Sequence, residues 1–426
     1  MPDARISVGP WTMPRRFFGS RPGLSSAVLH GAGLTLRLLF MLAVLRLSGP
    51  TLLGQYGLVC AIELVAIYLA GLEFHSFTTR RYARRPSVSR LRLCAACHSR
   101  LLLPLAPLTA VVSVAAANAL GLDFTTMQGF CLALIVGNGA VSQELGRFMV
   151  LRGMPVHSVA MSFIRNSSWL PFVLPFLSGT SALDATLALW AAASVVGTAW
   201  GLWVMRAALG FRGRVRMRYL ARGLALSRGY YGIATAGVLQ ANIDRFVLQA
   251  FLGPAAVGVL AFFQTLANTL PALVQSAVLN LWLPRLLRAF SLRESDRMAM
   301  LGQVCRRCAS ISLLLSVTVV AAALPLAMLT SHPEYVERLW GLALLLAGQV
   351  LLMWSQPLHL ALYGAHHDRA LLWLSLGALV FALLASIVLV AAFGLVGALV
   401  STPLSTATLV AARWLLLSRF RQRNSI

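Results

Sequence analysis

The chain has 426 residues, of which 58% are hydrophobic and 11% are charged. Soluble proteins carry about 25% charged residues, so this composition excludes an ordinary soluble domain and indicates an integral membrane protein. The net charge of +24 results from 36 basic residues, all of them arginine, against 12 acidic ones. Because little soluble fold is available to bind nucleic acid, we expect these arginines to face the cytosol and anionic lipid headgroups.

Twelve apolar runs have the length of a membrane-spanning helix, which needs about 20 residues to cross a hydrocarbon core of about 30 Å. No cleavable signal peptide is apparent, and the first run is long enough to stay in the membrane. The sequence therefore predicts an all-α membrane protein with about 12 transmembrane helices. The predicted helices are 27–47, 56–77, 100–120, 127–147, 156–177, 184–206, 229–252, 256–281, 309–330, 336–362, 369–392 and 395–417.

Arginines outside these runs fall on one side of the predicted membrane. They occupy the even-numbered links and both tails, whereas the odd-numbered links carry almost none, with Arg338 the clearest exception. Under the positive-inside rule, this pattern predicts that both termini are cytoplasmic. The arginines on this side include Arg80, Arg81, Arg84, Arg92, Arg147, Arg152, Arg218, Arg222, Arg288, Arg297, Arg419 and Arg421.

A repeat divides the chain into two halves. The segments GPTLLG (Gly49–Gly54) and GPAAVG (Gly253–Gly258) share the spacing GPxxxG at an offset of 204 residues. Two six-helix halves have the same orientation in the membrane, which is the parallel-repeat layout of many transporters. At the same offset, Arg81 matches Arg285 and Arg84 matches Arg288. The predicted units are a cytoplasmic tail at 1–24, an N-lobe at 25–222 and a C-lobe at 223–426, with the two bundles around a central cleft.

Charged residues also stand inside the predicted helices. A charge at mid-bilayer costs about 2.5–3.5 kcal/mol on insertion scales, so we expect these groups to face a wet cleft or one another. Adjacent residues project about 100° apart on a helix, so Asp244 and Arg245 cannot pair neatly with each other. Structural pairing with other partners is the alternative to a role at the cleft. These residues are Arg37, Glu63, Arg165, Asp244 and Arg245.

Other polar residues follow stripes at helical spacing, which puts each set on one side of its helix. The simplest assembly is a hydrophilic cleft lined from both halves, and the alternative is helix–helix contacts worth about 0.6 kcal/mol each. The stripes are Ser158, Ser162, Arg165 and Trp169; Gln264, Asn268 and Gln275; and Gln349, Gln356, His359 and Tyr363.

Two C-x-x-C pairs, Cys94/Cys97 and Cys305/Cys308, open the third and ninth predicted helices. Thiolates at this spacing can bind zinc, but the pairs are about 210 residues apart, far from zinc-finger spacing. We therefore expect packing rather than metal binding, and no cofactor. The sequence also lacks the nucleotide-binding P-loop and the serine-hydrolase and zinc-protease patterns.

Two stretches resemble the polysaccharide-biosynthesis family of oligosaccharide flippases, the Wzx-type O-antigen and exopolysaccharide transporters, in the superfamily of MATE exporters and the lipid II flippase. NIDRFVLQAFLGPAAVGVLAFF is similar to the family's Asn-x-x-Asp segment, which is followed by Gly and a helix ending in Pro, here Pro284. Asn242 stands two rather than three residues before Asp244, and Leu260 replaces a frequent aromatic residue. GPTLLGQYGLVCAIELVAIYLAGLEFHSFTTRRYAR resembles the counterpart in the first half.

The resemblance implies a flippase, not an enzyme, that moves a polyprenyl-diphosphate-linked oligosaccharide across the bacterial inner membrane by alternating access, for lipopolysaccharide or exopolysaccharide biosynthesis. Implied partners are the lipid-linked oligosaccharide, membrane lipids, a coupling proton or sodium ion, and polysaccharide polymerase machinery. Arginine suits a diphosphate because it makes planar, multi-donor contacts. Intramembrane acids often carry coupling ions, which points to Asp244 and Glu63. The expected substrate-binding residues are Arg37, Arg165, Arg245, Gln264, Asn268 and Trp169, the last by stacking on sugar rings.

Two other functions compete with this interpretation. A MATE-like cation-coupled exporter of small molecules shares the architecture, but its cationic substrates favour an acidic cleft, against which the predicted arginines argue. A membrane glycan polymerase or ligase commonly needs a sizeable external loop, whereas the longest predicted external link has about ten residues.

Overall fold

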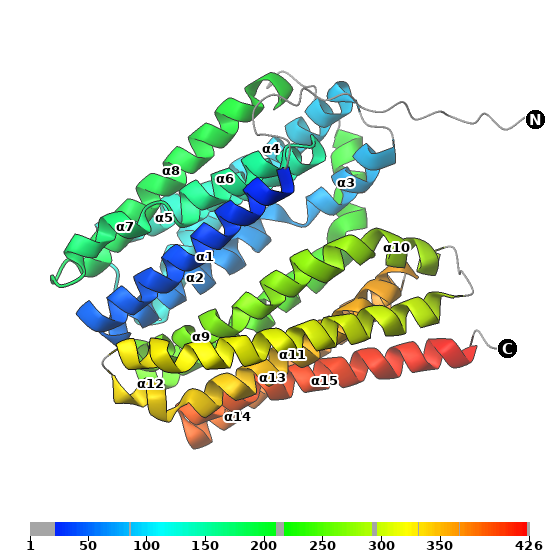
Figure 1. Ribbon diagram of the computed structural model, residues 1–426. Helices are drawn as coiled ribbons and strands as arrows, with labels where there is room; N and C mark the ends of the chain where they lie inside the picture. Colours follow the sequence, from blue (N-terminus) through cyan, green and yellow to red (C-terminus); the bar gives the residue numbers. More distant parts are fainter. Residues whose placement is uncertain are drawn as a thin grey trace, which may run out of the picture.

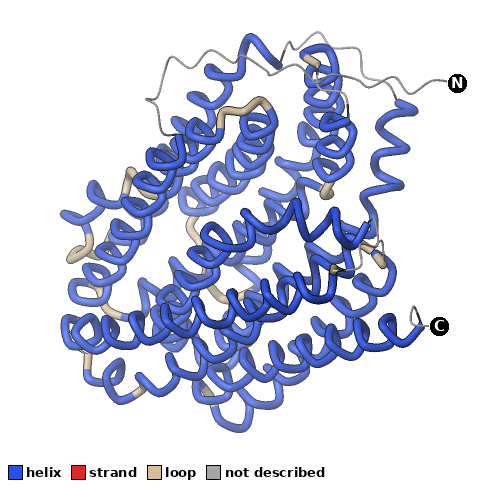
Figure 2. The backbone as a smooth tube through the Cα atoms, turned by 45° about the vertical axis from the view of Figure 1, so that its right-hand side comes forward, coloured by secondary structure: helices blue, strands red, loops and turns tan. Residues whose placement is uncertain are grey.

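A computed structural model describes residues 22–84, 87–209, 217–291, 296–330, 332–365 and 367–423. Across these ranges the chain is helical and contains no strand, and the loops are short (Figure 2), which confirms the predicted all-α fold. Nine helices within the described ranges are long and apolar enough to span a membrane. All but the last three residues of the predicted N-terminal tail lie outside these ranges.

The helices form two lobes (Figure 1). We call α1–α8 the N-lobe and α9–α15 the C-lobe. Each lobe supplies six spans, because α9 crosses twice and α6 with α7 forms one crossing, so the predicted layout of twelve helices in two bundles fits. The N-lobe contains α1 (Pro22–Leu47), α2 (Pro50–Gly71), α3 (Phe74–Arg84), α4 (Val88–Ala119), α5 (Thr126–Leu151), α6 (Pro155–Asn166), α7 (Leu170–Val173), η1 (Leu174–Phe176) and α8 (Ala182–Leu209). The C-lobe contains α9 (Met217–Val274), η2 (Gln275–Leu279), α10 (Asn280–Ser291), α11 (Arg297–Leu329), α12 (Pro333–Glu337), α13 (Leu339–Gly364), α14 (Asp368–Phe393) and α15 (Leu395–Arg423).

The predicted break between helices 229–252 and 256–281 is present as a kink in α9 at Gly253, the one residue inside it with non-helical backbone angles. Beyond Val274 the second of these predicted helices continues into η2 and the start of α10. Another predicted helix is interrupted. The predicted fifth helix, 156–177, breaks after Asn166 and resumes as the short α7 and η1. Both short helices begin next to a proline, Pro171 or Pro175, whose missing N–H suits a first turn and not a helix interior.

The two GPxxxG segments lie against each other, where α2 begins and where α9 turns. Gly49 and Gly253 adopt nearly the same backbone conformation, with φ of 83° and 78° and ψ of −177° in both. A methyl group on Gly54 would stand 1.7 Å from the carbonyl oxygen of Pro254, and one on Gly258 would stand 2.0 Å from that of Pro50. The repeat found in the sequence is therefore a symmetric contact between the lobes.

Three hydrogen bonds join the lobes at the same arginine-poor end, where Figure 1 shows the ribbons converging near α12. In each, a C-lobe side chain donates to an N-lobe backbone oxygen, and we call the three together the interlobe seal. The pairs are Arg245 Nη1 to Gly57 O at 3.2 Å, Gln249 Nε2 to Leu120 O at 2.9 Å, and His332 Nε2 to Leu45 O at 3.1 Å.

At the arginine-rich end, the first turns of α9 contact the N-lobe instead of the C-lobe. Leu220 is buried in a cluster with Phe74 of α3, and Gly223 faces the same ring. Farther along α9, Tyr230 donates to Asp368 of α14 at 2.6 Å. The predicted lobe boundary at residues 222/223 thus falls inside a helix that contacts both lobes.

Candidate functional site

The three arginines expected at the cleft surround one face of α2. Tyr56, Cys60 and Glu63 share that face, because they follow helical spacing. Glu63 interacts electrostatically with Arg165 and Arg37, and Cys60 with Arg37 and Arg245. Arg37 and Arg165 therefore lie near the Glu63 carboxylate, and Arg245, from a third helix, lies near Cys60 on the same face of α2.

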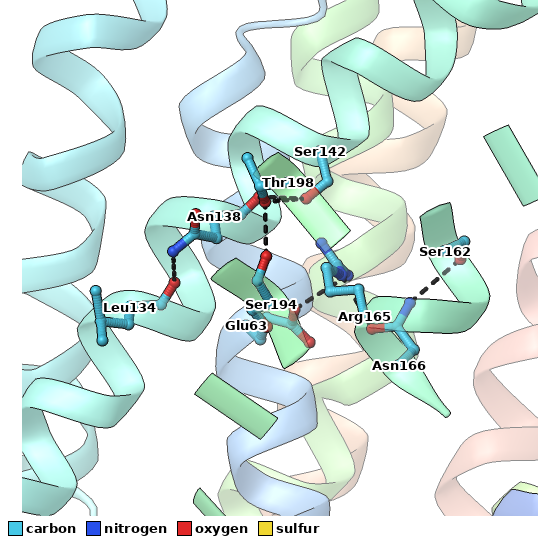
Figure 3. A network of polar contacts seen from close by, with 9 residues as sticks. All are labelled: Glu63, Leu134, Asn138, Ser142, Ser162, Arg165, Asn166, Ser194 and Thr198. Carbon is cyan, nitrogen blue, oxygen red and sulfur yellow. Dashed lines mark hydrogen bonds and ion pairs between the residues drawn. The ribbon is translucent and has the colours of Figure 1, made fainter. Parts of the chain in front are cut away.

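Arg165 and Glu63 form a buried ion pair. The two side chains point toward each other (Figure 3). Arg165 Nη2 lies 3.1 Å from Glu63 Oε1, and the two side chains are 11% and 9% exposed. Arg165 Nε also donates to Asn166 Oδ1 at 3.0 Å. A methyl group on Gly139 would stand 3.1 Å from both partners, so this glycine leaves room for the pair.

Arg165 is the deepest cation of a cavity of about 540 Å³ in the N-lobe. The cavity lies among the last turns of α2 and α5, the start of α3, and α6. Because α6 begins at Pro155, Arg165 sits about 15 Å further into the lobe than the start of that helix. Hydroxyl and amide side chains line the cavity between the arginines, namely Ser142, Gln143, Ser158, Ser162 and Asn166.

The mouth of the cavity carries a second group of charges, centred on Arg147. Its guanidinium contacts the Glu144 carboxylate closely, and Nη2 lies 3.6 Å from Glu73 Oε1. Behind them, His98 Nε2 lies 2.9 Å from Glu144 Oε2, and His75 Nδ1 lies 3.3 Å from Glu73 Oε2. Arg147 and His75 line the cavity itself. The sequence placed Arg147 in a link, and these acids and histidines were not anticipated; the spacing of Glu144 and Arg147 by three residues was the available signal.

Two of these groups lie outside the membrane-spanning helices and have shifted pKa values. Burial raises the pKa of the Glu73 carboxyl, and Arg147 opposes that rise. Burial, reinforced by Arg147, lowers the pKa of His75 to about 4. His75 is therefore neutral at physiological pH.

Asp244 and Arg245 point to different partners, as their angular separation requires. Asp244 is 5% exposed and accepts hydrogen bonds from Ser401 Oγ at 2.7 Å and from the Thr402 hydroxyl, both on α15. Arg245 Nε donates to Gln264 Oε1 at 2.7 Å, in addition to its bond across the lobes. Asp244 is thus held inside the C-lobe, while Arg245 reaches the N-lobe.

The remaining expected residues are dispersed. Trp169 is 3% exposed and stacks on Trp190 with ring centroids 5.7 Å apart, so it lies in the apolar core and not along the cavity. Arg37 is exposed, and Asn268 is exposed and accepts from Gln349 Nε2 at 3.2 Å. A further buried cation escaped notice: Arg413, 6% exposed, donates to Ser355 Oγ at 2.9 Å.

The C-x-x-C cysteines are buried, and none of the four is in a disulfide within the described ranges. Within the described ranges, no three His, Cys, Asp or Glu side chains gather in a way that could hold a metal ion.

Searches by sequence and by structure give different results. No protein-family model and no curated protein matches the sequence. Solved structures do match. An inward-facing multidrug resistance MATE family transporter of the MOP superfamily superposes with a TM-score of 0.73 at 13% identity, over 93% of this chain and 98% of that one. The lipid II flippase MurJ, in an inward closed conformation, gives a TM-score of 0.73 at 10% identity, over 93% and 87%. The fold is that of MOP-superfamily transporters.

Two further matches concern conformation and polarity. An outward-facing MATE transporter matches with a lower TM-score of 0.60 at 14% identity, over 93% of this chain and 94% of that one. This chain therefore resembles the inward-facing arrangement more. A MOP superfamily transporter from Pyrococcus furiosus, for which reverse polarity of the binding pocket suggests a different function, matches with a TM-score of 0.59 at 13% identity, over 94% and 95%.

Proposed function

We propose that this protein is a flippase that translocates a polyprenyl-diphosphate-linked oligosaccharide across a bacterial inner membrane by alternating access, for cell-surface polysaccharide biosynthesis. The observation that carries the proposal is the N-lobe cavity, where Arg165 lies beneath a lining of hydroxyl and amide groups. A diphosphate suits a guanidinium, which makes two parallel charge-assisted hydrogen bonds to an oxyanion. Sugar hydroxyls suit the serine, asparagine and glutamine side chains, which both donate and accept.

The charges around α2 favour an anionic substrate. Arg37 and Arg165 share Glu63 there, and Arg245 interacts with Asp244, which also accepts hydrogen bonds from α15, so three arginines face two carboxylates. Arg37 is exposed and has no carboxylate in contact among the described residues, so it is available to an incoming diphosphate. In the proposal, Gln264 orients Arg245 toward the cleft and Asn268 contributes from the C-lobe.

The arrangement corresponds to a loading state. The arginine-poor end is closed by the interlobe seal and by the contact between the GPxxxG segments, while the cavity lies in the arginine-rich half of the N-lobe. Under the positive-inside rule the cavity faces the cytoplasm, as do both termini. Substrate would load from the inner leaflet, and rocking of the two lobes would open the other end.

Glu63 and Asp244 are the proposed binding residues for the coupling ion. Glu63 pairs with Arg165 inside the cleft, so a proton or a substrate phosphate would change that pair directly. Asp244, with two hydroxyl donors in contact, offers the oxygen ligands that a sodium ion or a proton would use.

A MATE-like exporter of cations is the second candidate, and the carboxylates Glu63, Glu73 and Glu144 around the cavity favour it. Each of them already contacts an arginine. A cationic substrate would therefore have to displace a guanidinium to reach a carboxylate, whereas an anion would reach an arginine by displacing a carboxylate.

Transport in proteoliposomes separates the two functions. The substrate is a fluorescent polyprenyl-diphosphate-linked oligosaccharide, and the readout is the fraction protected from a membrane-impermeant quencher; we call this the transport assay. The proposal expects transport by the wild type, loss in Arg165→Gln, and no change in Arg338→Gln, which alters a partly exposed arginine away from the cavity. Uptake of organic cations with no movement of the oligosaccharide would favour the exporter instead.

A further inference from the structure

Arg147 occupies an unusual position in this cavity, because it is a cation shared by two carboxylates at the mouth. Glu144 holds it from the same helix, three residues away, and Glu73 holds it from the link between α2 and α3. The side chain of Arg147 is 22% exposed, whereas those of Glu73 and Glu144 are 9% and 5% exposed. The guanidinium is therefore the most accessible of these three side chains.

Each carboxylate has a second partner that would remain if Arg147 turned away. Glu144 keeps His98, at 2.9 Å. Glu73 keeps the hydroxyl of Ser76, which donates to Oε2 at 3.0 Å, and the ring of His75 at 3.3 Å. Because an unpaired buried charge is costly, these substitutes make the release of Arg147 feasible. The 3.6 Å contact to Glu73 is the longer of the two and is the one expected to break first.

We propose that Arg147 is a second anion-binding residue of the cavity, and that an oxyanion binds it by displacing Glu73. The inference rests on the proposed function and extends it to the mouth of the same cavity. Arg147 and Arg165 then form two stations for negative charge, separated by hydroxyl and amide groups. This layout fits a lipid-linked glycan that carries negative charge at more than one place, such as a diphosphate together with an acidic sugar.

Displacement of Glu73 has a consequence for protons. Among the described residues, the charged and titratable groups around Glu73 are His75 from α3, His98 from α4, and Glu144 and Arg147 from α5, while α9 presents Tyr219 and Leu220 to α3. Arg147 lowers the pKa of both Glu73 and His75. An anion on Arg147 cancels that effect, so both pKa values rise and a proton is taken up from water. By reciprocity, lower pH strengthens anion binding at this position.

The test measures binding of inorganic sulfate to the purified full-length protein in lipid nanodiscs by calorimetry. Sulfate keeps its double charge between pH 7.5 and pH 5.5, so a pH effect comes from the protein. Measurements in buffers of different ionisation enthalpy give the number of protons taken up on binding. The variants are Glu73→Gln, Arg147→Gln and Arg165→Gln, with Glu334→Gln, at a partly exposed position away from the cavity, as control.

Glu73→Gln is expected to bind sulfate about tenfold more tightly than wild type at pH 7.5, because the competing charge is gone. It should also lose most of the proton uptake. Arg147→Gln should bind at least about tenfold more weakly and take up no proton, whereas Arg165→Gln should bind more weakly and still take up protons. Glu73→Gln keeps every cation of the cavity, so its sulfate affinity still tests the inference if Arg147→Gln fails to fold.

Unchanged or weaker binding in Glu73→Gln would overturn the inference, as would an Arg147→Gln protein with wild-type affinity and proton uptake, or a wild type that binds no sulfate. The proposed function fails separately. If sulfate binds through Arg147 while the transport assay shows no movement of lipid-linked oligosaccharide, the site stands and the substrate is a different anion.

Discussion

Gly54 and Gly258 meet backbone to backbone, and each stands where any side chain would collide with the partner segment. The two residues belong to different lobes and to the same position of the sequence repeat. Close backbone approach through glycine is a common device between membrane helices, since packing replaces the hydrophobic driving force there. In this protein the glycine contact is reciprocal, so it lies where the two halves of the repeat meet symmetrically.

Gly54→Ala is expected to abolish transport while the protein still reaches the membrane, because its methyl group would lie 1.7 Å from Pro254 O and would push the lobes apart. The transport assay and membrane yield are the measurements. Gly237→Ala in α9 is the matched control, since nothing lies within 4 Å of its added carbon. Equal activity of the two variants would contradict a close contact where the halves of the repeat meet.

Removing one partner of the Arg165–Glu63 pair is expected to cost about 3–5 kcal/mol of stability, because the other charge stays buried. Glu63→Gln and Arg165→Gln should each lower the melting temperature in detergent. The double variant should regain much of the lost stability. It should stay inactive in the transport assay, because it lacks the Arg165 guanidinium that is proposed to bind the diphosphate. A double variant that transports normally would assign the pair a structural role only.

The interlobe seal should control access from the arginine-poor end. Gln249→Ala or His332→Ala removes one hydrogen bond worth about 0.5–1.5 kcal/mol, so the population opened at that end should rise about two- to tenfold. Cys60 reports the change, because it is partly exposed while the other five cysteines are buried. Labelling by an impermeant maleimide added from the arginine-poor side should accelerate accordingly. Cys60→Ser supplies the background, and unchanged labelling rates would show that these bonds do not limit opening.

Asp244→Asn tests ion coupling. Asparagine keeps the size of the side chain and an oxygen for Ser401 or Thr402, but it removes the negative charge. We expect the protein to fold and its transport to become insensitive to an imposed sodium or proton gradient. Asp184→Asn is the control, since Asp184 is exposed at the surface of the N-lobe, where it accepts a hydrogen bond from Gln128. Full gradient dependence in Asp244→Asn would move the coupling site elsewhere, with Glu63 the next residue to examine.

The sequence predicted the transmembrane architecture because apolar length and arginine placement are local properties. The prediction of which residues share a helix face failed where a helix ends earlier than expected. Trp169 follows Arg165 by four residues and should share its face, but α6 ends at Asn166, so the ring turns into the core instead. The Gly253–Pro254 pair, by contrast, predicted the break correctly, because α9 kinks at Gly253 with non-helical backbone angles.

The charged residues of the candidate site were predictable from the sequence, but their partners were not. Arg165, Glu63 and Arg245 are conspicuous because ionisable residues inside apolar runs are rare. Their pairings join segments far apart in the chain, as in the contact of Arg245 with Gly57. Arg147 was placed in a link because the predicted helix ended at residue 147, whereas α5 continues to Leu151 and carries the side chain to the cavity.

All three acceptors of the interlobe seal are main-chain oxygens of the N-lobe, at Leu45, Gly57 and Leu120. Replacing an amino acid leaves its carbonyl in place, so a saturation screen restricted to the N-lobe would recover no variant that deletes these bonds. Alleles that delete a bond of the interlobe seal should therefore map to the C-lobe half of the gene, whereas N-lobe alleles that loosen closure should act through packing, as at Gly54.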